Sequence, residues 1–203
     1  MIYELTLPKP SNKLLLSVED HFKKLSLDLS RKQWLDEFNN NKINAVPHDF
    51  AVVPELQQLV NEEYGNFFKY DLFAAVGVMK NLSENPACLP PHIDRGRTLA
   101  INYYIELGGD KVSTCFYDIE APTARTESIN LKYTQVNKKQ EIVFQKNKWY
   151  AYDVCVAHSV ENIIDTRLFL ILGVLTPAGH NNYRVKDLVA DNQNNACEFI
   201  KLL

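Results

Sequence analysis

Seven short stretches typical of β-strands follow one another between residues 72 and 175. Each is rich in β-branched and aromatic residues, and polar or glycine-containing segments separate them. Short strands in close succession are typical of a β-sandwich or β-barrel. The expected strands cover residues 72–79, 98–106, 112–117, 129–136, 141–144, 149–154 and 167–175.

The chain before these strands has a helical pattern. Residues 30–38 place Trp34, Leu35 and Phe38 on one helical face, and residues 54–65 have proline in the first turn and glycine at the end. The sequence therefore predicts a mainly β fold with N-terminal helices.

We expect a single domain over residues 1–203, because a chain of this length rarely divides further. Within it, residues 1–70 would be a helix-containing N-terminal support and residues 71–177 the β core. Residues 178–203 would be a C-terminal extension, whose last eight residues fit either an edge strand or a short helix.

The composition narrows the possible partners. The formal net charge is −3 and like charges do not cluster, so neither nucleic acid nor a membrane surface is indicated. The longest apolar run, residues 168–175, is far shorter than the roughly 20 residues of a membrane span. The start of the chain lacks the pattern of a secretory signal, and the four cysteines form no Cys-x-x-Cys pair. We expect a cytoplasmic protein with reduced thiols and a small-molecule or peptide partner.

Two histidines and an aspartate form the most informative motif. His92 and Asp94 are two residues apart, and His158 follows 64 residues after Asp94. Residues i and i+2 of a strand project from the same face, so one strand can direct His92 and Asp94 at a single ion. Two imidazoles and one carboxylate form the facial triad that holds non-haem Fe(II) and leaves coordination positions open.

An arginine follows the second histidine. Arg167 lies nine residues after His158 and begins an apolar run. Residues 162–166 look like a hairpin turn, which predicts that the strands of His158 and Arg167 are paired. A guanidinium at this place would bind a dicarboxylate cosubstrate.

Each of these residues also has a structural interpretation. His92 and Asp94 fit a surface loop after two prolines, and His158 fits a core histidine hydrogen-bonded to Glu161 or Asp153. Arg167 fits an ion pair with either of the same two carboxylates, because an unpaired buried charge is costly. The combined spacing of the four residues favours a metal site.

The order His-x-Asp, a long gap, His and then Arg resembles the Fe(II)/2-oxoglutarate-dependent dioxygenases over roughly residues 72–177. The resemblance implies a double-stranded β-helix, which is a jelly-roll or cupin-like core, with helices packed before it. Residues 158–171 look most like the aspartyl/asparaginyl β-hydroxylase-like and prolyl-hydroxylase-like branches. Aspartyl/asparaginyl β-hydroxylases lack the metal-binding carboxylate that Asp94 supplies here, and the halogenases of the superfamily also leave that position open.

The resemblance implies a role for each candidate residue. His92, Asp94 and His158 would be the catalytic metal ligands for Fe(II), and Arg167 would bind the distal carboxylate of 2-oxoglutarate. On the expected strand 98–106, Asn102 and Tyr104 share a face and would contact the same cosubstrate. Ile101, Tyr103 and Ile105 would line the other face, and Trp149 and Tyr152 are expected in the core or at its rim. Arg97 would meet a substrate at the mouth of the barrel.

The activity implied is hydroxylation of a C–H bond in an amino acid, peptide side chain or small metabolite. O2 would be the oxidant, and succinate and CO2 would be released. Two alternatives stay open at this point. One is a jelly-roll protein that binds a metal or ligand without turnover. The other is a zinc-dependent hydrolase, because two histidines and an aspartate also bind Zn(II).

Overall fold

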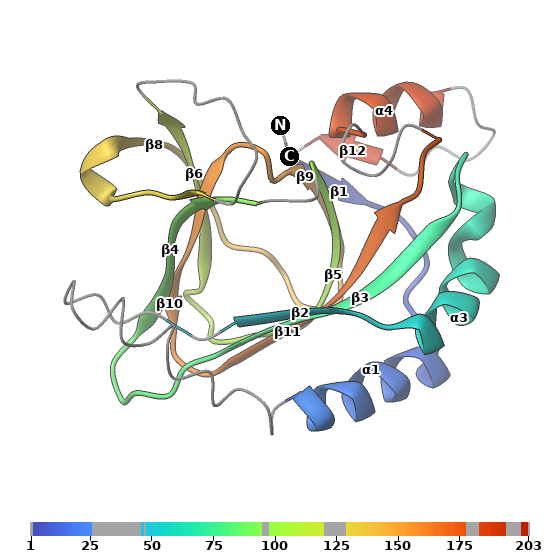
Figure 1. Ribbon diagram of the computed structural model, residues 1–203, viewed down its shortest axis with the longest axis horizontal. Helices are drawn as coiled ribbons and strands as arrows, with labels where there is room; N and C mark the ends of the chain where they lie inside the picture. Colours follow the sequence, from blue (N-terminus) through green and yellow to red (C-terminus); the bar gives the residue numbers. More distant parts are fainter. Residues whose placement is uncertain are drawn as a thin grey trace.

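Two antiparallel β-sheets face each other in the computed structural model (Figure 1). The structure describes residues 2–25, 46, 48–94, 98–119, 129–177, 183–193 and 200–202. The large sheet has seven strands in the order β12-β1-β9-β5-β11-β3-β2, and the small sheet has five in the order β7-β4-β10-β6-β8. None of the helices in these ranges is long and apolar enough to span a membrane.

The elements follow one another along the chain in a mainly β pattern. The strands are β1 (Ile2–Leu5), β2 (His48–Val52), β3 (Leu72–Lys80), β4 (Ala87–Ile93), β5 (Leu99–Leu107), β6 (Ser113–Ile119), β7 (Ile129–Asn130), β8 (Val136–Ile142), β9 (Trp149–Asp153), β10 (Ala157–Ile163), β11 (Thr166–Val174) and β12 (Ile200–Leu202). The helices are α1 (Asn12–Leu25), α3 (Pro54–Tyr64) and α4 (Val185–Gln193), with 3₁₀ turns η1 (Gly65–Phe67) and η2 (Tyr133–Gln135).

Eight of the strands form a jelly roll. We number these strands one to eight in chain order: β3, β4, β5, β6, β8, β9, β10 and β11. Across the large sheet they lie in the order first, eighth, third and sixth, and across the small sheet in the order second, seventh, fourth and fifth. Two sheets connected in this way form a double-stranded β-helix, so the predicted fold class is confirmed.

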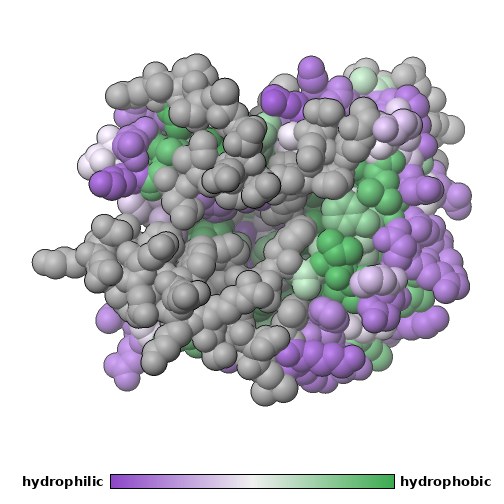
Figure 2. Space-filling model, viewed as in Figure 1, coloured by the Kyte–Doolittle hydropathy of each residue, from purple (hydrophilic) through white to green (hydrophobic). Residues whose placement is uncertain are grey.

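Two apolar layers hold this arrangement together. The interior between the sheets is filled by aromatic and aliphatic side chains of both sheets, among them Tyr104, Phe116, Tyr152 and Phe169. The outer face of the large sheet packs against α1, α3 and α4 (Figure 1). In Figure 2, hydrophilic residues cover the outer side of this helical layer, and hydrophobic residues gather between it and the centre of the view. Such amphipathic helices bury one stripe and hydrate the other.

Five predicted strands and one predicted helix are confirmed. Strands β3, β5, β6, β9 and β11 differ from the expected ranges by at most two residues at either end. Helix α3 begins at a proline and buries Leu56, Val60 and Tyr64, which are spaced four residues apart. The predicted helix at residues 30–38 lies outside the described residues.

Two predicted strands are wrong. Residues 129–136 form only the two-residue strand β7 before the chain enters η2, and the next strand begins at Val136. The expected strand 141–144 is instead the end of β8, which stops at Ile142. The η2 turn breaks the alternation because the Gln135 side chain accepts a hydrogen bond from the Lys132 N–H at 2.9 Å, which closes the turn locally.

The predicted hairpin between the strands of His158 and Arg167 is also wrong. Strand β10 belongs to the small sheet, whereas β11 pairs with β3 and β5 in the large sheet. The short connection therefore crosses between the sheets. The Gly108 carbonyl holds the crossing, because it accepts hydrogen bonds from the N–H groups of Ile164 at 2.9 Å and Asp165 at 3.0 Å.

Gly77 permits the close packing of an aromatic ring within the interior. It is paired across β3 and β11 with Phe169, and a Cβ atom at Gly77 would overlap the Phe169 ring. We expect Gly77→Ala to lower the free energy of unfolding by about 1–3 kcal/mol, the usual cost of overpacking a core. Gly65→Ala is the matched control, because a Cβ there meets nothing within 4 Å and its φ of −54° suits any residue. Equal urea midpoints for the two variants would contradict this account.

Candidate metal centre

Three interior side chains form a row across the small sheet. His92 of β4 is paired with His158 of β10, and His158 is paired on its other side with Phe116 of β6. The two imidazole centroids are 4.3 Å apart, and the Phe116 ring stacks on His158 at 6.2 Å. The register of three strands therefore sets the separation of the histidines, which does not depend on a loop.

Both imidazoles are oriented by the backbone in the same way. His92 Nδ1 lies 2.8 Å from the Pro90 carbonyl oxygen, and His158 Nδ1 lies 2.9 Å from that of Val156. A carbonyl can only accept, so each Nδ1 carries the proton and Nε2 is the basic nitrogen of the neutral ring. This is the arrangement in which a second partner fixes the tautomer of a metal-binding histidine. The sequence also fitted a core histidine hydrogen-bonded to Asp153 or Glu161. The Val156 carbonyl, and neither carboxylate, orients Nδ1 of His158.

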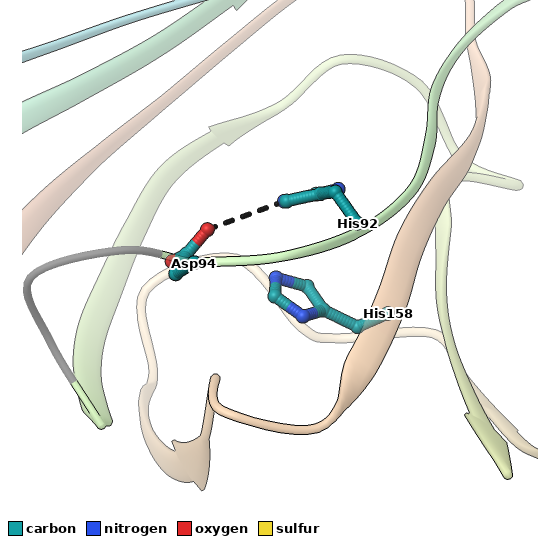
Figure 3. A group of neighbouring side chains, drawn as sticks. All are labelled: His92, Asp94 and His158. Atoms are coloured by element: carbon teal, nitrogen blue, oxygen red, sulfur yellow. Dashed lines mark ion pairs between the residues drawn. The ribbon is translucent and has the colours of Figure 1, made fainter. Parts of the chain in front are cut away.

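Asp94 completes the cluster at the end of β4. Its N–H donates to the Val154 carbonyl at 3.2 Å, and its Oδ1 lies 3.3 Å from His92 Nε2 (Figure 3). One ligand atom from each of His92, Asp94 and His158 can be chosen so that all lie within 4.8 Å of one another. Two imidazole nitrogens and one carboxylate oxygen are a donor set that suits a divalent transition metal.

Arg167 is a buried cation in the same interior. Its side chain is 2 % exposed, and Nη2 donates to the Thr114 hydroxyl at a long 3.4 Å. The guanidinium carbon lies 4.6 Å from the centre of the Tyr104 ring, a cation–π contact. Within the described residues no carboxylate lies within ion-pair distance of Arg167, and its Nε has no hydrogen-bond partner.

The two carboxylates considered as structural partners of Arg167 are engaged elsewhere. Asp153 Oδ1 accepts a hydrogen bond from the Val185 N–H at 2.9 Å, and Glu161 Oε1 accepts one from Tyr133 on the outer face of the small sheet at 2.8 Å. Burying an unpaired charge is unfavourable, so the missing carboxylate partner of Arg167 needs an explanation beyond the stability of the fold.

A cluster of three polar side chains lies beside the arginine. Asn102 Nδ2 donates to the Tyr152 hydroxyl at 2.8 Å, and the hydroxyls of Tyr104 and Tyr152 are 3.0 Å apart. Asn102 is 1 % exposed, and its Oδ1 has no partner among the described residues. Only one of the two phenols can donate to the other, so the cluster retains one hydroxyl donor and one amide atom for a further group.

Aromatic contacts connect the cluster of His92, Asp94 and His158 with the Arg167 side chain. The Phe116 ring stacks on His158 and meets the Tyr152 ring edge-on at 5.6 Å. The Tyr152 hydroxyl is hydrogen-bonded to the Tyr104 hydroxyl, and the Arg167 guanidinium lies over the Tyr104 ring. The cation and the metal ligands thus line one continuous interior.

The structure brings together most of the residues singled out from the sequence. His92, Asp94, His158, Arg167, Asn102 and Tyr104 all lie in or at the end of the interior. Ile101, Tyr103 and Ile105 share the opposite face of β5, as predicted, and this face packs against the helices. Trp149 lies in the same helical layer, whereas Tyr152 joins the interior polar cluster. Arg97 lies outside the described residues.

Comparisons with known proteins add little to this geometry. No protein-family model and no curated protein matches the sequence. Among solved structures, a mutant of Bacillus subtilis oxalate decarboxylase OxdC is 12 % identical with a TM-score of 0.31, over 70 % of this chain and 27 % of that one. A Pseudomonas putida prolyl-4-hydroxylase is 13 % identical with a TM-score of 0.32, over 71 % of this chain and 84 % of that one. This chain thus spans about a quarter of the decarboxylase, and the jelly-roll fold follows from its own strand order.

Removal of one imidazole tests the metal centre. We expect His158→Ala to weaken Fe(II) binding by more than about 100-fold, because loss of an outer partner of a ligand alone costs about 10–100-fold. Equilibrium dialysis under anaerobic conditions measures the affinity, and circular dichroism checks the fold. His21→Ala, on α1 and away from the cluster, is the control and should bind Fe(II) like the parent protein. Equal affinity in both variants would rule out His158 as a ligand.

Proposed function

We propose that this protein is an Fe(II)- and 2-oxoglutarate-dependent oxygenase that hydroxylates a C–H bond of an amino acid, peptide side chain or small metabolite. The observation that supports this most strongly is the buried Arg167, which shares an interior with the His92, Asp94 and His158 cluster and has no carboxylate partner among the described residues. A metal centre next to an uncompensated cation suits a cosubstrate that chelates the ion at one end and carries a carboxylate at the other.

The chain's residues would divide the work between holding the ion and holding the cosubstrate. His92, Asp94 and His158 would occupy one face of the ion and leave its other positions to the cosubstrate and O2. Bound Fe(II) with 2-oxoglutarate supplies the oxidation of a C–H bond, with release of succinate and CO2. The protein's part is to place the reactants, and the row of β4, β10 and β6 gives that placement rigidity.

Arg167 would bind the distal carboxylate of 2-oxoglutarate. Its Nε and Nη atoms lie in a fixed plane that matches a carboxylate, and the buried setting strengthens the interaction. Asn102 and Tyr104 would supply the remaining hydrogen bonds, with Tyr152 orienting both of them. Arg97 at the end of the metal-ligand segment is our candidate for a substrate contact.

The two alternative functions give Arg167 no comparable role. A zinc-dependent hydrolase would use the same three ligands, but its activated water needs no buried cation in the same interior. A binding protein without turnover would need Arg167 and the three metal-binding residues only if the molecule that it binds required both the cation and the metal ion. Retention of a complete donor set beside an anion site favours the oxygenase.

The decisive experiment is an anaerobic titration of the Fe(II)-loaded protein with 2-oxoglutarate, followed by visible absorption and then by exposure to O2. Chelation of the iron by the keto acid produces a visible charge-transfer band, and turnover releases succinate. A band with succinate release supports the oxygenase. A band without succinate in the presence of reductant would favour the binding protein. If no band appears on addition of 2-oxoglutarate while iron stays bound, the proposal is overturned.

Arg167 variants test the cosubstrate role separately. We expect Arg167→Ala to keep Fe(II) affinity and to weaken 2-oxoglutarate by about 2 kcal/mol or more, roughly 30-fold, the scale of a lost charge-assisted hydrogen bond. Arg167→Met retains most of the volume and should lose the cosubstrate equally while remaining folded. Arg184→Ala at the start of α4 is the control for loss of a positive charge. Unchanged 2-oxoglutarate affinity in both Arg167 variants would remove this residue from the site.

A further inference from the structure

A groove on the outer face of the small sheet is unrelated to the metal centre. Its volume is about 410 Å³, within the range of small-ligand sites. It is lined by residues of β6, β8, β10 and the turn before β8: Cys115, Tyr117, Tyr133, Val136, Lys138, Glu141, Glu161 and Asn162. The alternation of β10 explains its place, because His158 points inward and Ser159 and Glu161 project from the opposite face.

A strap of residues 131–135 gives the groove one of its walls. Strand β7 lies at one edge of the small sheet and β8 at the other, so the chain between them crosses the outer face. In Figure 1 this segment is the yellow coil beside β8, on the small sheet's side of the molecule. Tyr133, which is 40 % exposed, anchors the strap by donating its hydroxyl to Glu161 Oε1 at 2.8 Å. The floor beneath is apolar, formed by Cys115, Tyr117 and Ala157 among others.

Glu161 is the focus of the groove. Its Oε1 accepts hydrogen bonds from the hydroxyls of Tyr133, Tyr117 and Ser159, the second at 3.4 Å and the third very short. These donors hold the carboxylate in one orientation. Among the residues described here, no lysine, arginine or histidine pairs with Glu161. The carboxylate is therefore well oriented and lacks a direct ion-pair partner among the described residues.

The other charged side chains of the groove leave its net charge negative. Lys138 is committed to Glu141 at 2.7 Å, so the groove carries one lysine and two glutamates, a net charge of −1. Burial is the main cause that raises the pKa values of Tyr117, Tyr133 and Cys115, and the negative charge of Glu161 adds to it in each case. Lys138 lowers the pKa of Cys115 and thus offsets part of the negative charge, but two glutamates outnumber the one lysine.

We propose that this groove binds a small organic monocation, a primary ammonium or guanidinium group on a short aliphatic stem. Glu161 would pair with the cationic head, and the ring faces of Tyr117 and Tyr133 would contribute cation–π contacts. The side chains of Val136 and Cys115 would cover the stem. Such a group is carried by a free alkylamine or by a lysine or arginine side chain of a peptide. This inference does not depend on the proposed oxygenase activity.

NMR titration of the full-length protein with n-butylammonium chloride tests the proposal. Shifts are expected for amides of β6, β8 and β10, and 1-butanol, which has the same stem without the charge, should bind at least about tenfold more weakly. A second series compares the tripeptide amide acetyl-Gly-Lys-Gly with the free amine, and tighter binding of one identifies the source of the cation. Equal binding of butanol and butylammonium, or shifts confined to another part of the molecule, would overturn the proposal.

Variants locate the interaction on Glu161. Glu161→Gln keeps the acceptor for the three hydroxyls but removes the charge, and should weaken butylammonium by about tenfold or more. Glu106→Gln is the matched control, because Glu106 is a strand carboxylate outside the groove that is already paired with Lys146 at 2.6 Å. Tyr133→Leu on the exposed turn leaves the sheet intact and should also weaken binding. Unchanged affinity in both Glu161→Gln and Tyr133→Leu would rule out the groove.

Discussion

The antiparallel pairing of β4 with β10 is the constraint on which the candidate site depends. It places His92 directly opposite His158, and pairing of β10 with β6 adds Phe116 to the same row. Because side chains alternate along a strand, a shift of one residue would move every member of the row to the outer face. The register is therefore fixed from both sides of β10. The irregularity between His158 and Val160 confines the departure from regular pairing to the residues beyond the histidine.

The buried guanidinium of Arg167 is the second constraint, and it opposes stability. The Tyr104 ring and the single long bond to Thr114 compensate only part of the cost of removing a charge from water. Strand β11 begins directly after the crossing between the sheets, which the Gly108 carbonyl holds by hydrogen bonds. Arg167 therefore enters the interior at a point with little conformational freedom. The weak internal compensation of this charge is the reason for proposing that an anion binds there.

Much of the jelly roll could be predicted from the sequence, because β3, β5, β6, β9 and β11 lie in the large sheet or face the interior with continuous apolar runs. Strands β4 and β10, which carry the candidate metal ligands, lack a clear strand pattern and were expected only from the motif of His92, Asp94 and His158. Two prolines interrupt the pattern of β4, and Ser159, Glu161 and Asn162 make part of β10 look like a turn. The two-residue spacing of His92 and Asp94 indicated one strand, and the distant His158 indicated another. The error about β10 and β11 has a different origin, because the strand order within a sheet is set by contacts distant in the sequence.

The polar residues that concealed β10 have a physical reason to be there. Helices cover the outer face of the large sheet, which is therefore apolar on both sides, whereas the strap of residues 131–135 crosses the outer face of the small sheet. Ser159 and Glu161 can be polar because hydroxyl groups of the strap and of β6 satisfy them. One strand thus presents an imidazole to a metal-ligand cluster on its inner face and a carboxylate to a groove on its outer face.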